Sequence, residues 1–260
     1  PSQSSAASDV YKRQFMIHWL DHKKSGKFSE KSFVIESGSS SLPGVFWQGS
    51  SPSEKSPLVL LAHGGSGHKR SEKMVAMGTW ISEGFGWNAV SIDGPAHGDR
   101  GPVQKSTDPA YREMWQRPDV VGTMVEDWKC VINAFVELDS TDPERIGFWG
   151  LSMGTMFGIP YVASDSRIKA AVLGKSGLTG SSVERSGIRP YFEESAPQIM
   201  QPVLFSIQWD DERFDRQGQL ELFDLIGSSD KRLHAYPGRH QDSGPEALQV
   251  QAEFLKRYLE

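Results

Sequence analysis

The chain has 260 residues, 37% of them hydrophobic, and a formal net charge of −5 from 28 basic and 33 acidic side chains. This composition indicates one globular domain with a sizeable core, and it lacks the basic surplus of nucleic-acid-binding proteins. The longest uninterrupted apolar stretch, residues 58–62, is far shorter than the roughly 20 residues that cross a membrane. A single cysteine, Cys130, excludes an internal disulfide and a multi-cysteine metal site. We therefore expect a cytoplasmic protein without a membrane span.

The first residues are unusual for the start of a protein. The chain opens on Pro1 without an initiator methionine, and residues 5–14 resemble translated sequencing-adapter read-through. This segment lacks the apolar stretch of a secretory signal. We treat residues 1–15 as a disordered, artefactual tail, with a genuine tail as the alternative, and residues 16–260 as a single domain. This interpretation leaves the natural N-terminus and any targeting signal undefined.

Short apolar runs alternate with helical patterns along the rest of the chain. Residues 31–36 and 45–48 flank a turn-rich connection and predict an antiparallel pair. Further strands are predicted at residues 58–62, 88–92, 145–149, 168–173, 203–207 and 233–236. Helices are predicted at residues 71–83, 119–138, 152–163, 216–226 and 245–259. Because several strands are apolar on both faces, this alternation predicts an α/β domain with a mostly parallel sheet.

The strongest chemical signal is Gly150-Leu151-Ser152-Met153-Gly154, which lies between a predicted strand and the helix that follows it. In a G-x-S-x-G elbow the chain turns abruptly from strand to helix, and the flanking glycines leave room for a strained, exposed serine. The helix N-terminus also favours developing negative charge. The motif occurs in ordinary turns as well, but its strand-turn-helix context predicts Ser152 as a nucleophile.

A second signal, His63-Gly64-Gly65-Ser66-Gly67, follows the predicted strand at residues 58–62. A glycine-rich loop lets backbone N–H groups point at a substrate oxygen, and two such donors stabilise the oxyanion of acyl transfer. We predict that the N–H groups of Gly65 and Met153 form this oxyanion hole. A phosphate-binding loop is the alternative, but neither of its glycine motifs is met here. His63 itself is predicted to stabilise its loop.

A serine nucleophile on this kind of sheet needs an acid and then a histidine later in the chain. Asp210, Asp211 and Glu212 follow the predicted strand at 203–207, and His240 follows the strand at 233–236. The carboxyl ends of parallel strands share one rim of the sheet, so these groups can converge with the serine. His240 is predicted as the general base, and Asp211 is preferred over Asp210 as the acid that orients it.

Several other residues lie near the predicted rim. Asp93, His97 and Asp99 are close enough in sequence to suggest a metal site, but a tight structural turn is favoured because no second histidine cluster joins them. Trp115 and Trp209 lie in predicted loops near this rim, where they either form an apolar substrate pocket or simply pack against their loops. We expect no metal and no cofactor.

The order of these motifs resembles the α/β-hydrolase superfamily from about residue 30 to residue 260. The likeness is greatest to the dienelactone-hydrolase-like and prolyl-oligopeptidase-like branch. It implies an eight-stranded, mostly parallel sheet flanked by helices, with a small cap or none, and hydrolysis through an acyl-serine intermediate. Members often carry a His-Gly pair before the acid loop, where this chain has Ile207-Gln208-Trp209. That departure leaves the choice between Asp210 and Asp211 open.

We therefore expect a cofactor-independent serine hydrolase that acts on a small-molecule carboxylic ester. One alternative is a serine peptidase or amidase of the prolyl-oligopeptidase type, whose usual N-terminal propeller has no room in this chain. A second alternative is a non-catalytic ligand-binding relative, although binding alone does not require a nucleophile, a base and an acid together. No nucleic-acid partner is expected, and the sequence is compatible with a homo-oligomer.

Overall fold

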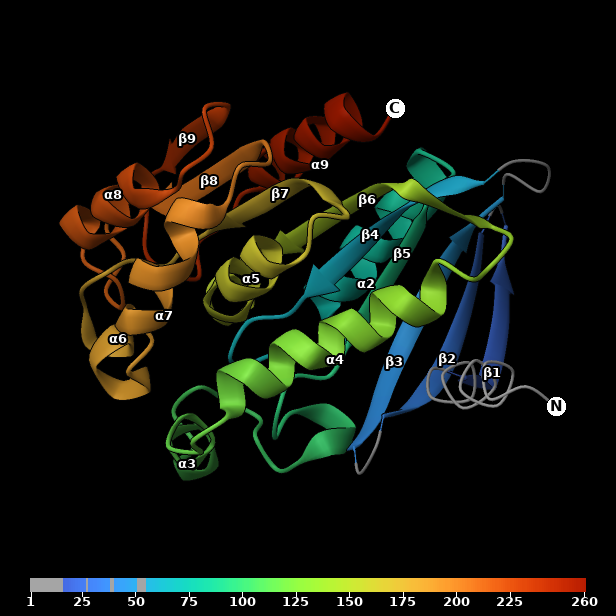
Figure 1. Ribbon diagram of the computed structural model, residues 1–260, viewed down its shortest axis with the longest axis horizontal. Coiled ribbons are helices and arrows are strands. Elements are labelled where there is room, and N and C mark those ends of the chain that lie inside the picture. Colours follow the sequence, from blue (N-terminus) through green and yellow to red (C-terminus); the bar gives the residue numbers. More distant parts are fainter. Residues whose placement is uncertain (1–15, 27, 38–39, 51–54) are drawn as a thin grey trace, which may run out of the picture.

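A computed structural model describes residues 16–26, 28–37, 40–50 and 55–260 of the chain (Figure 1). Within these residues the centre is a 9-stranded sheet in the order β1-β2-β3-β5-β4-β6-β7-β8-β9. The strands are β1 (Ile17–Ser25), β2 (Phe28–Ser37), β3 (Ser40–Gly49), β4 (Ser56–Ala62), β5 (Asn88–Ile92), β6 (Thr141–Gly150), β7 (Ile168–Gly174), β8 (Val203–Gln208) and β9 (Lys231–Tyr236). The predicted tail, residues 1–15, lies outside the described residues.

The sheet is mostly parallel, as the sequence predicts. The strands β1, β2, β3 and β5 pair antiparallel, whereas β5, β4, β6, β7, β8 and β9 form a continuous parallel run. The carboxyl ends of this run therefore share one rim, where the loops that carry the predicted chemistry emerge.

The expected eight strands have to be corrected to nine within the described chain. The additional strand is β1, which pairs antiparallel with β2 from Ile17 opposite Ile35 to Ser25 opposite Phe28. Its sequence, IHWLDHKKS, is polar over much of its length, and it forms one edge of the sheet. Charged edge strands bury little apolar surface, so a search for apolar runs does not detect them.

Helices cover both faces of the sheet. In Figure 1, α4 and α5 lie in front of the strands, and α2 and α9 lie behind them. All five predicted helices occur, whereas α3, α6 and α7 are short helices in segments where none was predicted. The helices are α2 (Glu72–Thr79), α3 (Pro109–Trp115), α4 (Val120–Phe135), α5 (Met153–Ser164), α6 (Ser181–Ser186), α7 (Arg189–Ser195), α8 (Arg216–Leu225) and α9 (Pro245–Leu259), with shorter turns at Trp80–Gly84, Gly98–Arg100 and Ala196–Gln198.

Each face of the sheet has its own hydrophobic core. Trp128 of α4 and Tyr161 of α5 pack with Phe148 on one face, and Met77 of α2 and Leu255 of α9 belong to the core on the other. Every residue of β4 is buried, which explains its unbroken apolar sequence. The two cores fix the sheet between its helices and so hold the rim loops in place.

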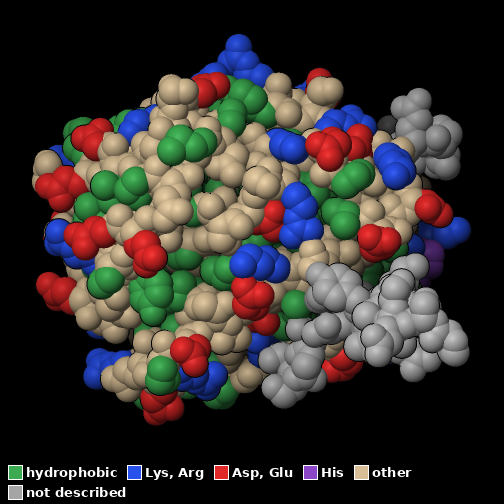
Figure 2. Space-filling view, viewed as in Figure 1, with side chains coloured by type: hydrophobic (Ala, Val, Ile, Leu, Met, Phe, Trp, Pro, Cys, Tyr) green, Lys and Arg blue, Asp and Glu red, His purple; other side chains and the backbone are tan. Residues whose placement is uncertain are grey.

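The face that carries α4 and α5 is polar and mixed in charge. Figure 2 shows lysine and arginine side chains interspersed with aspartate and glutamate side chains over this face. Among the described residues, every helix is too short or too polar to cross a bilayer.

Candidate active site

Ser152 stands at an abrupt turn between β6 and α5. Its backbone has φ 60° and ψ −121°, a conformation that a non-glycine residue adopts only under strain. A Cβ atom on Gly154 would lie 2.6 Å from the Ala62 carbonyl oxygen, and one on Gly150 would lie 2.8 Å from the Gly154 carbonyl oxygen. The two glycines are therefore required because the turn is pressed against the end of β4.

A buried threonine ties this turn to the neighbouring strand β7. The Oγ1 atom of Thr155 lies 2.8 Å from the carbonyl oxygen of Gly150 and 2.7 Å from that of Gly174, and it accepts the Gly174 N–H at 2.7 Å. The Ser152 N–H donates to the Gly174 carbonyl oxygen at 2.9 Å. These bonds hold the strained serine in place. Thr155 is not among the residues predicted from the sequence, although it lies only three positions after the serine.

The structure brings Ser152, His240 and Asp211 into one hydrogen-bonded row. His240 Nε2 lies 2.9 Å from Ser152 Oγ, and His240 Nδ1 lies 2.8 Å from Asp211 Oδ2. The side chains of His240 and Asp211 are 3% and 0% exposed. The other carboxylate oxygen of Asp211 accepts the N–H groups of Arg213 and Phe214 at 2.8 and 3.1 Å, so its orientation is fixed from both sides.

The neighbouring acidic residues of this loop lie elsewhere. Asp210 is 63% exposed and faces Arg216 at 3.4 Å, so Asp211 is the carboxylate that contacts His240. Glu212 accepts the backbone N–H of His240 at 3.0 Å, and this hydrogen bond lowers the pKa of the Glu212 carboxyl group. Glu212 therefore anchors the histidine backbone, a contact that the sequence analysis missed.

Lys175 is a second anchor that sequence reasoning missed. It follows β7, has φ 48° and is buried. Its Nζ atom donates to the His240 carbonyl oxygen at 2.8 Å and to Ser243 Oγ at 2.6 Å. Burial lowers the pKa of Lys175 to about 8. A lysine directly after a parallel strand was the available signal, but its partners are 65 or more residues away in sequence.

The two predicted oxyanion donors lie beside Ser152. Met153 is the first residue of α5. Two cavities, described below, open beside Ser152, and Gly65 borders both of them. Within the described chain, the N–H groups of Gly65 and Met153 have no hydrogen-bond acceptor. A Cβ atom on Gly65 would lie 2.8 Å from the Tyr111 hydroxyl, so glycine is needed there too. Both N–H groups are thus available to a bound ligand.

His63 braces the loops after β4 and β5. Its Nε2 atom accepts the Gly94 N–H at 2.8 Å, and Nδ1 lies 2.9 Å from the Gly64 carbonyl oxygen. This arrangement requires the neutral ring, with its proton on Nδ1. Burial, reinforced by the nearby His97, lowers the pKa of His63 to about 3. The structural role that the sequence suggests for His63 matches these contacts.

Hydrogen bonds and an ion pair hold the Asp93 turn together. The Asp93 carboxylate accepts the backbone N–H groups of Lys69 and Asp99 at 2.9 and 2.8 Å and pairs with Lys69 Nζ at 2.6 Å. These contacts match the predicted tight turn. In the part of the chain that the structure describes, no cluster of three histidine, cysteine or acidic side chains could hold a metal ion.

Ser152 lies between two cavities. The smaller, of about 110 Å³, is bordered by Tyr111, Trp115 and Phe214. The larger, of about 350 Å³, is bordered by His240 and Lys175.

Of the two tryptophans considered for the pocket, Trp115 borders a cavity at Ser152 and Trp209 does not. The Trp115 ring stacks on Phe157 at 4.8 Å and borders the small cavity. Trp209 is 45% exposed, stacks against the Arg216 guanidinium group at 4.1 Å and borders neither cavity. For Trp209 the structure therefore matches the second alternative, packing outside the pocket, because its partner on α8 holds it at the surface.

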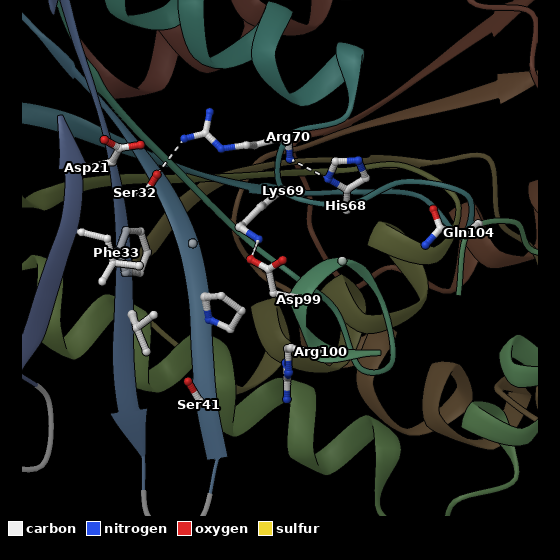
Figure 3. A pocket seen from close by; sticks show the side chains of 15 residues that line it. Asp21, Ser32, Phe33, Ser41, His68, Lys69, Arg70, Asp99, Arg100 and Gln104 are labelled. Carbon is white, nitrogen blue, oxygen red and sulfur yellow. Dashed lines mark hydrogen bonds and ion pairs between the residues drawn. The ribbon is translucent and has the colours of Figure 1, made fainter. Parts of the chain in front are cut away.

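A third cavity, larger than these two, lies away from Ser152. It measures about 960 Å³ and is bordered by residues of β1, β2 and β3 and of the loops after β4 and β5. Figure 3 shows the Lys69 side chain ending on Asp99 there. Arg70 pairs with Glu30 and Arg100 with Asp127, so the basic groups of this cavity are already neutralised by acidic ones.

A strained serine after a parallel strand, hydrogen-bonded to a histidine that a buried carboxylate orients, defines the α/β-hydrolase class on this fold. The chain is 34% identical to a cold-adapted esterase from an Arctic intertidal metagenomic library, in a PEG-bound structure that matches 94% of this chain and 100% of that one with a TM-score of 0.83. The native structure of that esterase gives 31% identity and a TM-score of 0.78 over the same shares. The chain belongs to the family of this esterase.

More distant likenesses concern the fold or part of the chain. Acetyl xylan esterase 1 from Thermoanaerobacterium sp. JW/SL YS485 is 14% identical, with a TM-score of 0.73 over 99% of this chain and 94% of that one. The quorum-quenching protein AidA of Acinetobacter baumannii (strain MDR-ZJ06) is 26% identical over 117 residues, which are 45% of this chain and 34% of AidA. The match thus spans about a third of that curated relative. No family model matches the chain.

Proposed function

We propose that this protein is a carboxylic-ester hydrolase that works through an acyl-serine intermediate. The observation that carries the proposal is the row of hydrogen bonds from Ser152 Oγ to His240 Nε2, 2.9 Å, and from His240 Nδ1 to Asp211, 2.8 Å. The family membership of the chain supports ester chemistry. Residues 16–260 act in this proposal as one catalytic domain.

The first half of the reaction forms the acyl-enzyme. Ser152 Oγ attacks the ester carbonyl carbon while His240 Nε2 takes the hydroxyl proton, and Asp211 orients the ring and stabilises its charged form. The negative charge that develops on the carbonyl oxygen is received by the N–H groups of Gly65 and Met153. His240 then returns the proton to the departing alcohol, and the tetrahedral intermediate collapses.

The second half releases the acid. A water molecule gives a proton to His240 and attacks the acyl carbon, and the Ser152 oxygen leaves with the proton that His240 returns. Because His240 Nε2 must reach the departing oxygen, the alcohol group occupies the larger cavity that His240 borders. The acyl group then lies in the smaller cavity beside Tyr111 and Trp115.

The test is covalent labelling of the folded protein with a fluorophosphonate, followed by intact-mass measurement. We expect one adduct on the wild type, none on Ser152→Ala, and one on Ser182→Ala, a matched control whose serine also borders the small cavity. Turnover of 4-nitrophenyl acetate should fall by about 10⁴-fold or more in Ser152→Ala. Folded wild type that takes no label, or Ser152→Ala that still takes it, would overturn the proposal.

An amide substrate separates esterase from peptidase activity. The wild type should hydrolyse 4-nitrophenyl acetate much faster than an aminoacyl 4-nitroanilide. A preference for the anilide would replace the esterase proposal with a peptidase of the same mechanism.

A further inference from the structure

The small cavity beside Ser152 is lined by three arginines from three separate segments. They are Arg112 of α3, Arg185 of α6 and Arg213 of the loop after β8. The acidic residue on the same lining is Asp108. In a chain whose formal net charge is −5, this places a local excess of positive charge next to the proposed nucleophile.

Much of the hydrogen-bonding capacity of these arginines is unused. Within the described residues, neither Arg112 nor Arg185 forms an ion pair with a carboxylate, and Arg185 bonds only to Ser181. Arg213 Nη1 donates to Ser106 Oγ at 2.9 Å, and its Nε atom lies 3.9 Å from Glu212 Oε1. A guanidinium group has five N–H donors, so each of the three arginines can still bind an anion.

The one acidic residue on this lining offsets only part of the charge of the three arginines. The Asp108 carboxylate accepts the backbone N–H groups of Gln104 and Lys105, both at 2.8 Å, and these bonds lower its pKa. It is therefore ionised but bound to its own turn, and within the described residues no arginine forms an ion pair with it. Arg112 and Arg185 thus differ from the basic groups of the 960 Å³ cavity, where Lys69, Arg70 and Arg100 each face a carboxylate.

The cavity also limits the size of what it holds. Its volume of about 110 Å³ is well below the roughly 300 Å³ at which drug-sized sites begin. Its walls include the rings of Tyr111, Trp115 and Phe214, and Trp115 is held by stacking on Phe157. The space suits a short chain of a few heavy atoms that ends near the arginines.

We propose that this cavity binds a carboxylate at the far end of the acyl group, so that the preferred substrates are monoesters of short dicarboxylic acids. The inference rests on the proposed function, which places the acyl group in this cavity. Ser152 attacks the ester carbonyl and the alcohol leaves. The free carboxylate takes no part in the bond changes and is held by Arg112, Arg185 and Arg213.

The test compares two esters of nearly equal shape. Monomethyl succinate carries the carboxylate, whereas methyl levulinate has a neutral methyl ketone in its place. We expect kcat/KM of the wild type to be at least about tenfold higher for monomethyl succinate, since hydrogen bonds to charged groups are the stronger ones. Sodium chloride at 1 M should reduce this preference by screening.

The variant that tests the arginines is Arg112→Gln/Arg185→Gln, which leaves Arg213 and its backbone bond to Asp211 in place. The ratio of kcat/KM for the two esters should fall at least about tenfold in this variant. The matched control is Arg189→Gln on α7, an exposed arginine that pairs with Glu193, and it should keep the wild-type ratio.

Two results would overturn the inference alone. One is wild type that hydrolyses both esters equally well, and the other is an unchanged ratio in the folded double variant. In both cases hydrolysis of methyl levulinate keeps the proposed function intact. If the wild type hydrolyses neither ester nor 4-nitrophenyl acetate, the proposed function fails and this inference fails with it.

Discussion

The side-chain nitrogen of Lys175 lies 2.8 Å from the backbone oxygen of His240. Lys175 directly follows β7, the strand whose last residue, Gly174, also accepts the N–H of Ser152. The end of one strand is therefore bonded both to the proposed nucleophile and to the segment that carries the proposed base. This common support fixes the distance between Ser152 and His240.

Replacing Lys175 by methionine should loosen the histidine without removing it. Lys175→Met deletes the bonds to His240 and Ser243 while it keeps a side chain of similar length. Because a displacement of about 1 Å can cost about 100-fold in rate, we expect kcat to fall by about 10- to 100-fold with a smaller change in KM. Ester kinetics and the rate of fluorophosphonate labelling measure the effect.

Two further variants separate positioning from a general loss of structure. Lys169→Met, on β7 at an exposed ion pair with Glu144 of β6, should keep wild-type kcat. Lys175→Arg retains hydrogen-bond donors and should recover part of the labelling rate. Equal labelling rates in wild type and Lys175→Met would show that the contact does not position His240.

The two adjacent aspartates should differ sharply when each is changed to asparagine. Asp211→Asn removes the charge that stabilises the protonated His240 and should lower kcat by about 10⁴-fold. Asp210→Asn alters an exposed carboxylate near Arg216 and should change kcat by less than about twofold. Both effects are read from ester turnover at pH 7, and a larger loss in Asp210→Asn than in Asp211→Asn would reverse the assignment.

The case of these aspartates shows what the sequence can and cannot predict. Strand ends locate the loops that carry Ser152 and His240, because the carboxyl ends of parallel strands meet at one rim. Adjacent residues of a loop point in different directions, and which of them reaches the histidine depends on the turn. The structure places Asp211 there through the N–H groups of Arg213 and Phe214, and no sequence pattern encodes that choice.

The contacts missed at the site join residues that are far apart in the chain. Lys175 contacts His240, which lies 65 residues later in the chain. The small cavity is lined by arginines of α3, α6 and the loop after β8. Contacts of this kind depend on how whole helices and strands pack together. Strand β1 escaped detection for a different reason, since its charged edge sequence contains little of the apolar alternation that marks a strand.

The glycines around the serine should differ from other glycines in their tolerance of a methyl group. Gly154→Ala adds a Cβ atom that would lie 2.6 Å from the Ala62 carbonyl oxygen, which is closer than normal contact. We therefore expect a loss of about 1–3 kcal/mol in the free energy of unfolding. Gly122→Ala on α4 meets nothing within 4 Å and should stabilise the protein by up to about 1 kcal/mol. Urea unfolding of the two variants measures the difference, and equal stability would contradict the crowding at the elbow.

His63 should make the protein less stable as the pH falls. Its pKa is about 3 in the folded protein because the ring is buried beside His97, with Asp93 and His68 as the other charged or titratable neighbours. The unfolded chain protonates this residue near pH 6.5. Between about pH 6.5 and 3, the unfolded state therefore binds a proton that the folded state does not, which favours unfolding by up to about 1.4 kcal/mol per pH unit.

The variant His63→Gln removes this titration while it keeps a polar side chain. Its free energy of unfolding, measured by urea denaturation from pH 7 to pH 4.5, should therefore fall less steeply with decreasing pH than that of the wild type. The slope is the quantity to compare, because the variant also loses the bond from Gly94 and starts from a lower stability. His18→Gln, at an exposed position on β1, serves as the control. If wild type and His63→Gln lose stability with the same slope, His63 takes up its proton equally in both states and is not held neutral by the loops around it.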